Sequence, residues 1–180
     1  MVTLAEMIVG FMSSGPGLPV MLLYIALATI PMTLVHELGH ALAARRWVGG
    51  DVAVVVGNVG KVVRMRLGKV QLTINALAVL PHPDGYAEFD ASRATARGVL
   101  LVALAGPAAS LAAGLVAALA LSVAPMAGVL HDLVWAATLC GVGGVFTLVP
   151  LSYEERRGGP TVHTDGRLAW DATRVLLALR

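Results

Sequence analysis

Residues 18–47 read LPVMLLYIALATIPMTLVHELGHALAARRW, and this apolar run carries no charged residue before Glu37. A helix over the whole run would be on the order of 40 Å long, at about 1.5 Å per residue. The hydrocarbon core of a bilayer is only about 30 Å thick. We therefore predict that this run spans a membrane, with its last turns at the interface.

The pattern His36-Glu37-Leu38-Gly39-His40 lies late in this span. Two histidines four residues apart share one helix face, so both imidazoles can bind one zinc ion. The Glu37 carboxylate, one residue along, can take a proton from a zinc-bound water and later give it to the leaving amine. The spacing predicts zinc ligation by His36 and His40 and a catalytic base at Glu37.

A structural alternative would make these residues core or capping histidines beside a solvated glutamate. The apolar run argues against it, because a carboxylate in such surroundings costs on the order of 2 to 3 kcal/mol or more. Packing contacts of a purely structural glutamate would not offset that cost. We favour a metalloprotease site.

Composition supports a membrane protein: 57% of the 180 residues are apolar and 13% are charged, against about 25% charged in a soluble domain. No linker, charge block or repeat divides the chain, so we expect one domain over residues 1–180. The single Cys140 excludes an intrachain disulfide. The net charge of +2 is small, and we expect no nucleic-acid partner.

Two further uncharged runs, from Gly98 to Leu130 and from Leu133 to Leu151, are long enough to cross a bilayer. The predicted spans are therefore about 18–47, 96–122 and 128–150.

All thirteen Lys and Arg residues lie either between the first two spans or after the third. With three spans these segments share one side, and the positive-inside rule makes it the cytoplasm. We expect an integral protein of a bacterial-type cytoplasmic membrane with its N-terminus outside and its catalytic side and C-terminus cytoplasmic. A basic region before the first span is missing, so we expect no cleaved signal.

The segment after the first span alternates apolar and polar residues at period two, which is typical of strands. We predict strands near 52–56, 61–67 and 70–76, forming a small antiparallel sheet at the interface or behind helices, because open sheet edges avoid lipid. An amphipathic C-terminal helix should start near Asp165. The fold class is thus a mainly α membrane protein with three transmembrane helices, this sheet and the terminal helix. Gly106, Ser110 and Gly114 form a small-residue stripe that favours close helix packing.

A catalytic zinc ion needs a third protein ligand. The metzincin continuation is absent, since Ala43 and Arg46 occupy the places of its glycine and third histidine. The ligand must lie in a distant polar segment. The open candidates are Asp165, Asp84, His82, His163 and Glu154.

From about residue 30 to 166 the chain resembles the site-2 protease family of intramembrane zinc metalloproteases. The resemblance rests on the histidine motif, the strand-rich segment, Ala105-Gly106-Pro107 in the second span, and Pro150 followed by Asp165-Gly166. It implies one zinc ion with Asp165 as the third ligand. It also implies cleavage of transmembrane or membrane-tethered protein substrates within or near the lipid bilayer.

The chain departs from the family pattern at two places. Thr147 stands where the family has asparagine, and fifteen residues separate Pro150 from Asp165. We interpret the inserted residues 153–159 as a surface loop. Asp84 remains the main rival ligand, in a segment, 81–86, that we interpret as a turn because of its Pro and Asp-Gly residues.

Two other functions are open: a catalytically silent membrane scaffold of the same fold, and a zinc or proton transporter. The intact Glu37 argues against the scaffold, because a structural zinc site needs no base. Three spans leave little room for a transport pathway. An open edge of the sheet at 52–76 could hold an extended substrate by strand addition. With no sensing domain in the sequence, any regulation is expected to come from a membrane partner.

Overall fold

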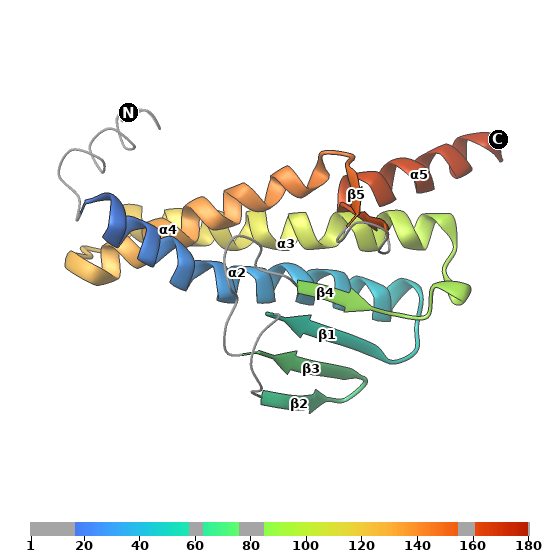
Figure 1. The fold of residues 1–180 in the computed structure, drawn as a ribbon, viewed down its shortest axis with the longest axis horizontal. Coiled ribbons are helices and arrows are strands. Elements are labelled where there is room, and N and C mark those ends of the chain that lie inside the picture. Colours follow the sequence, from blue (N-terminus) through green and yellow to red (C-terminus); the bar gives the residue numbers. More distant parts are fainter. Residues whose placement is uncertain (1–16, 58–62, 76–84, 155–160, 180) are drawn as a thin grey trace.

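The computed structural model describes residues 17–57, 63–75, 85–154 and 161–179. Three of its helices are long and apolar enough to cross a membrane, which confirms the predicted fold class. They are α2 (Leu18–Trp47), α3 (Ala96–Val123), and α4 (Gly128–Gly143) continued by the 3₁₀ turn η2 (Gly144–Leu148). Figure 1 shows them side by side, with a sheet on one side of the bundle and helix α5 (Asp165–Ala178) on the other.

Small residues set the distances between the helices. A Cβ atom added to Gly39 of α2 would lie 2.5 Å from the Ala105 carbonyl oxygen of α3, so the two backbones touch there. A Cβ atom on Gly141 of α4 would lie 2.6 Å from the Cα atom of Gly114 of α3. Gly114 therefore has the packing role predicted for the small-residue stripe.

The sheet has four strands in the order β2-β3-β1-β4. Their bounds are β1 Val52–Val56, β2 Val63–Leu67, β3 Val70–Ile74 and β4 Gly85–Glu88. The first three are the strands predicted near 52–56, 61–67 and 70–76; residues 61, 62 and 76 lie outside the described ranges.

The prediction of an all-antiparallel sheet is wrong in one respect, because β1 and β3 are parallel. Strands β2 and β3 form an antiparallel hairpin around Gly68, whose φ of 63° suits glycine. Strand β3 lies between β2 and β1 in the sheet. It runs opposite to β2 and in the same direction as β1. A mixed sheet results.

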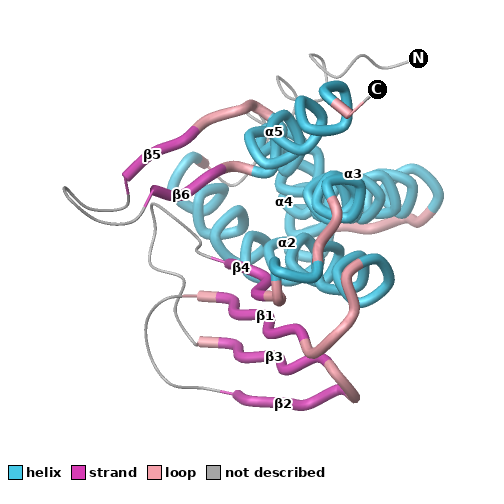
Figure 2. Tube along the Cα trace, turned by 90° about the vertical axis from the view of Figure 1, so that its right-hand side faces the viewer, coloured by secondary structure: helices cyan, strands magenta, loops and turns pink. Residues whose placement is uncertain are grey.

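The segment 81–86, interpreted as a turn, is also corrected in its last two residues. Gly85 and Tyr86 belong to β4, which pairs antiparallel with β1 and is an edge strand of the described sheet. Residues 81–84 lie outside the described ranges. Figure 2 shows β4 nearest to α2 and β2 farthest from the helices.

One face of the sheet is buried against the C-terminal half of α2. The buried residues of this core are apolar and come from β1, β3, α2 and α3: Val52, Val54, Val56, Val70, Leu72, Ala41, Ala44 and Val102. The sheet is thus shielded by helices on this face, as expected for a sheet close to lipid.

The inserted residues 153–159 are not simply a surface loop. Strands β5 (Ser152–Glu154) and β6 (Thr161–His163) pair antiparallel, and residues 155–160 between them are not described. The next residue, Thr164, caps α5 by accepting a hydrogen bond from the Arg167 amide. Helix α5 begins at Asp165, where the sequence predicts it.

Candidate metal centre

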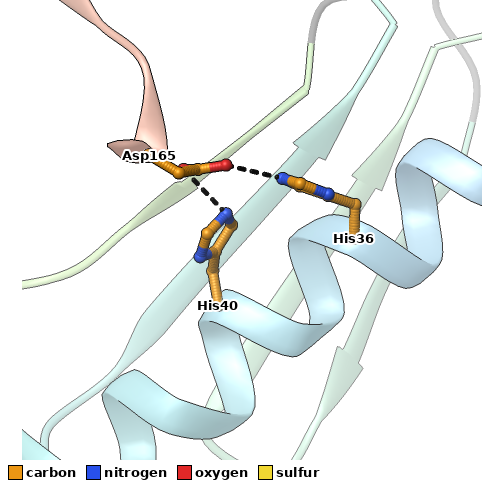
Figure 3. A group of neighbouring side chains, drawn as sticks. All are labelled: His36, His40 and Asp165. Atoms are coloured by element: carbon orange, nitrogen blue, oxygen red, sulfur yellow. Dashed lines mark hydrogen bonds and ion pairs between the residues drawn. The ribbon is translucent and has the colours of Figure 1, made fainter. Parts of the chain in front are cut away.

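Three side chains from two distant parts of the chain meet beside the middle of α3. His36 and His40 lie one turn apart on α2, and Asp165 is the first residue of α5. The Asp165 Oδ2 atom is 3.0 Å from His36 Nε2, and Oδ1 is 3.1 Å from His40 Nε2 (Figure 3). One ligand atom from each residue lies within 4.8 Å of the others. Their side chains are 12%, 9% and 15% exposed, so little solvent reaches them.

Both imidazoles are oriented by hydrogen bonds to α3. His40 Nδ1 lies 2.7 Å from the Val102 carbonyl oxygen, an acceptor only, so Nδ1 carries the proton and donates it. His36 Nδ1 lies 2.9 Å from Ser110 Oγ, which can accept in the same way. Without a metal ion, the Nε2 atoms can donate to Asp165; once Nε2 loses its proton to a metal ion, the proton kept on Nδ1 leaves the Nε2 lone pair as the ligand, and such partners fix the ligand ring.

The residues present therefore fit a zinc ion. Two imidazole nitrogens and one carboxylate are a usual ligand set for a catalytic zinc, which keeps its remaining position for water. Among the described residues, this is the one group of three His, Cys, Asp or Glu side chains close enough to hold a metal ion.

Two glycines clear space for this arrangement. A Cβ atom on Gly106 of α3 would overlap the His40 ring, and one on Gly166 of α5 would overlap the Leu148 carbonyl of η2. Gly106 therefore admits the His40 imidazole, and Gly166 lets α5 start close enough for Asp165 to reach the histidines.

Sequence reasoning missed the role of Ser110. It assigned Gly106 and Ser110 to helix packing, whereas both contact the site histidines. The signal was present: the two residues are four apart and share a face of α3. What the sequence does not show is that α2 presents His36 and His40 to that face.

The surroundings of Asp165 favour its charged form. Burial alone would raise the pKa of this carboxyl, but hydrogen bonds from His36 and His40 outweigh burial and hold the pKa well below its usual range. A hydrogen bond from the Thr147 hydroxyl, whose single proton can go to Asp165 or to the Gly144 carbonyl 2.9 Å away, also lowers it. Asp165 is thus an ionised carboxylate, the form that binds metal.

Glu37 is 7% exposed and packs against strand β4. A Cβ atom on Gly85 would lie 2.9 Å from Glu37 Cγ and 3.0 Å from Glu37 Oε1. The first residue of β4 therefore passes directly beside the carboxylate, which an ordinary side chain at position 85 would obstruct.

The other suggested ligands do not join the group in the part of the chain that the structure describes. His163 is exposed and its Nδ1 atom is 2.8 Å from Ser152 Oγ. Glu154 lies in β5, and of this residue only the backbone is described. His82 and Asp84 lie outside the described residues.

Three side chains that could hold a metal ion, with a buried glutamate beside them, form an arrangement suited to metal-assisted hydrolysis. Residues 24–164 match the family model of peptidase family M50. The match includes His36, Glu37 and His40 and ends one residue before Asp165, whose placement rests on the geometry. No curated protein matches the chain.

Proposed function

The chain belongs to peptidase family M50, the site-2 protease family, and we propose that it is a zinc-dependent endopeptidase cutting transmembrane or membrane-tethered proteins within or near the bilayer. The observation that carries the proposal is the convergence of His36, His40 and Asp165, with Glu37 buried beside them. The three helices able to span a membrane support a membrane-embedded site.

In this proposal His36, His40 and Asp165 would hold a zinc ion, which would supply a Lewis acid for the scissile carbonyl and for the attacking water. His36 and His40 offer Nε2 to the metal, while the Val102 carbonyl keeps His40 Nδ1 protonated and the Ser110 hydroxyl can accept the proton of His36 Nδ1. The Glu37 carboxylate accepts the proton of the attacking water and passes it to the leaving amine nitrogen. Low exposure of these side chains excludes bulk water from the reaction.

A helical substrate must unwind before its peptide bond can be attacked, and an extended segment needs a partner. The sheet has two edge strands, β2 and β4. Of these, β4 contacts Glu37. We place the substrate strand along β4, in place of the 52–76 edge suggested by the sequence.

The hydrogen-bonding directions in β1 indicate which β4 groups are free. The Val52 amide donates to the Lys69 carbonyl at 3.0 Å, and the Val56 carbonyl accepts from the Asn75 amide at 2.8 Å. Even-numbered residues of β1 therefore bond toward β3. Because backbone groups alternate along a strand, the odd-numbered residues bond toward β4.

The partners of those odd-numbered residues are Glu88 and Tyr86. Their backbone groups are used within the sheet, which leaves Gly85 and Ala87 with N–H and C=O groups at the free edge, the edge of β4 that no described strand covers. A substrate strand pairing with these groups would run past Glu37.

The orientation expected from the charges completes the proposal: the end of the bundle that carries the sheet faces the cytoplasm of a bacterial-type cell. The substrate would enter from the surrounding lipid, and a membrane partner would regulate its access.

The test uses the full chain reconstituted in lipid with a transmembrane reporter substrate. We expect the wild type to bind one zinc ion and cut the reporter, and Glu37→Gln to keep the zinc but cut roughly 10²- to 10⁴-fold more slowly, the usual contribution of an acid–base group. Glu88→Gln, which alters an exposed glutamate of β4, is the matched control and should behave as wild type.

Cleavage by Glu37→Gln at the wild-type rate would disprove the assigned base. Zinc binding by a wild type that cuts no membrane reporter would favour the scaffold alternative.

A further inference from the structure

A basic cluster lies at the end of the helix bundle where α2 stops and α3 begins. Arg46 and Trp47 are in the last turn of α2, and Arg97 is the second residue of α3. The Arg46 guanidinium carbon is 4.8 Å from the centroid of the Trp47 ring, and that of Arg97 is 5.9 Å away. Two helices thus bring two cations to one indole.

In the described part of the chain, neither of these two arginines has an anionic partner. Among the described residues, no carboxylate lies within ion-pair distance of Arg46 or Arg97, whereas nearby Arg93 pairs with Asp90 at 3.0 Å. Both unpaired arginines are exposed, and Trp47 is 46% exposed. The cluster is therefore open to a ligand and carries uncompensated positive charge.

Helix electrostatics explain one cation and not the other. Arg46 lies at a helix C-terminus, where positive charge is favourable. Arg97 lies at a helix N-terminus, where positive charge is unfavourable, and the first turn of α3 holds no acidic residue to offset it. An external anion would stabilise Arg97 in this position.

The position of the cluster indicates where the anion comes from. Both α2 and α3 are able to span a membrane. The cluster lies where α2 ends and α3 begins, so its residues lie at one end of the helix bundle. Tryptophan at the end of a span typically lies at the level of the lipid headgroups. Leu42, four residues before Arg46 on the same face of α2, is 61% exposed. An exposed apolar side chain thus lies one helical turn from the cationic cluster.

We propose that Arg46, Trp47 and Arg97 bind the phosphate headgroup of an anionic phospholipid, with an acyl chain lying along Leu42. Guanidinium groups make charge-assisted hydrogen bonds to phosphate oxygens, often two at a time. One lipid would join the end of the first span to the start of the second and lock the two helices that orient the metal centre.

The test measures the melting temperature of the full chain in neutral detergent during titration with phosphatidylglycerol, phosphatidylcholine or inorganic phosphate. We expect phosphatidylglycerol to raise the melting temperature and to remain bound in native mass spectrometry, and the other two to have no comparable effect. An equal shift with phosphatidylcholine would overturn the proposal. An equal shift with inorganic phosphate would also overturn it, because the site would then be a free-anion site.

Two variants test whether the lipid binds at Arg46 and Arg97. Arg46→Gln combined with Arg97→Gln should weaken phosphatidylglycerol binding at least tenfold while zinc content stays unchanged. Arg174→Gln, which removes an exposed arginine of α5, should bind the lipid as wild type does. Unchanged lipid binding by the double variant would disprove the assignment. The lipid comparison on the wild-type chain decides the proposal even if the double variant does not fold.

Discussion

The hydroxyl of Ser110 is the residue-scale feature that ties the second span to the metal centre. It lies 2.9 Å from His36 Nδ1, on a helix that also holds His40 through the Val102 carbonyl. Ser110→Ala removes the acceptor and frees the His36 ring to rotate. We expect zinc affinity to fall roughly 10- to 100-fold, as is usual for such partners, in a competition titration against a chelator.

Ser122→Ala is the matched control, because Ser122 lies on the same helix and bonds only the Leu119 carbonyl in the structure. Its zinc affinity should equal that of the wild type. Equal affinities for Ser110→Ala and Ser122→Ala would show that His36 needs no partner.

A second residue-scale prediction concerns the space that Gly106 leaves for the His40 ring. Gly106→Ala introduces a Cβ atom where the His40 ring lies. Either the ring moves away from Asp165 or α3 moves away from α2, and overpacking of this kind costs about 1 to 3 kcal/mol. We expect a lower melting temperature together with reduced zinc stoichiometry.

Gly143→Ala serves as the comparison, because a Cβ atom at Gly143 meets nothing within 4 Å. If both variants melt and bind zinc as the wild type does, the close contact of Gly106 with His40 is unimportant.

The sequence reveals site residues when their spacing alone encodes the chemistry. His36, Glu37 and His40 are readable because three residues on one helix define the pattern. Asp165 came from a family resemblance, and the structure places it against both histidines. Ser110 was missed because its role depends on the rotation of α3 against α2, a tertiary property that no local pattern contains.

At the scale of elements, strand β4 has two roles that one substitution can separate: pairing with β1 and pairing with a substrate strand. The Ala87 amide faces the free edge, since its neighbours Tyr86 and Glu88 bond to β1. Ala87→Pro therefore removes an outward donor and keeps the pairing with β1. One lost hydrogen bond of about 1 kcal/mol predicts a roughly fivefold or greater fall in kcat/KM for a transmembrane reporter.

Ala87→Ser keeps the backbone N–H and should cut at the wild-type rate. Zinc content and melting temperature, measured on both variants, report whether the sheet and the metal centre are intact. An intact Ala87→Pro protein with normal cleavage would rule out substrate pairing at this edge.

The helices could be predicted well because each is a local property of the chain. Uncharged runs defined the three spans, and the bounds of α2 are those predicted. The period-two pattern found β1, β2 and β3, but strand direction depends on which strands become neighbours after folding, so the parallel pairing of β1 with β3 was missed. Gly85 belongs to an Asp-Gly turn pattern in the sequence and Tyr86 follows it, and pairing with β1 overrides this local preference.

At the scale of the whole molecule, the metal centre joins the two ends of the described chain. His36 and Asp165 are 129 residues apart, on the first span and the last helix. A zinc ion bound there would hold α5 against α2, so metal binding and global stability should be coupled.

We expect chelation to lower the melting temperature of the wild type and added zinc to restore it. At zinc concentrations of about 100 times Kd, the gain amounts to about 2.7 kcal/mol. Asp165→Ala should lose this response, because its two imidazoles alone bind the ion weakly. Asp171→Ala alters another acidic residue of α5, whose partner is Arg167 at 2.9 Å, and should keep the response.

Glu37→Gln separates the two functions of the site, since it should respond to zinc as the wild type does while being inactive. A zinc response that survives in Asp165→Ala would mean that the third ligand lies elsewhere, and Asp84 would be the next residue to replace. Loss of the response in Asp165→Ala alone would establish that the C-terminal helix closes the metal centre. The length of chain between Pro150 and Asp165 would then matter only in allowing α5 to reach α2.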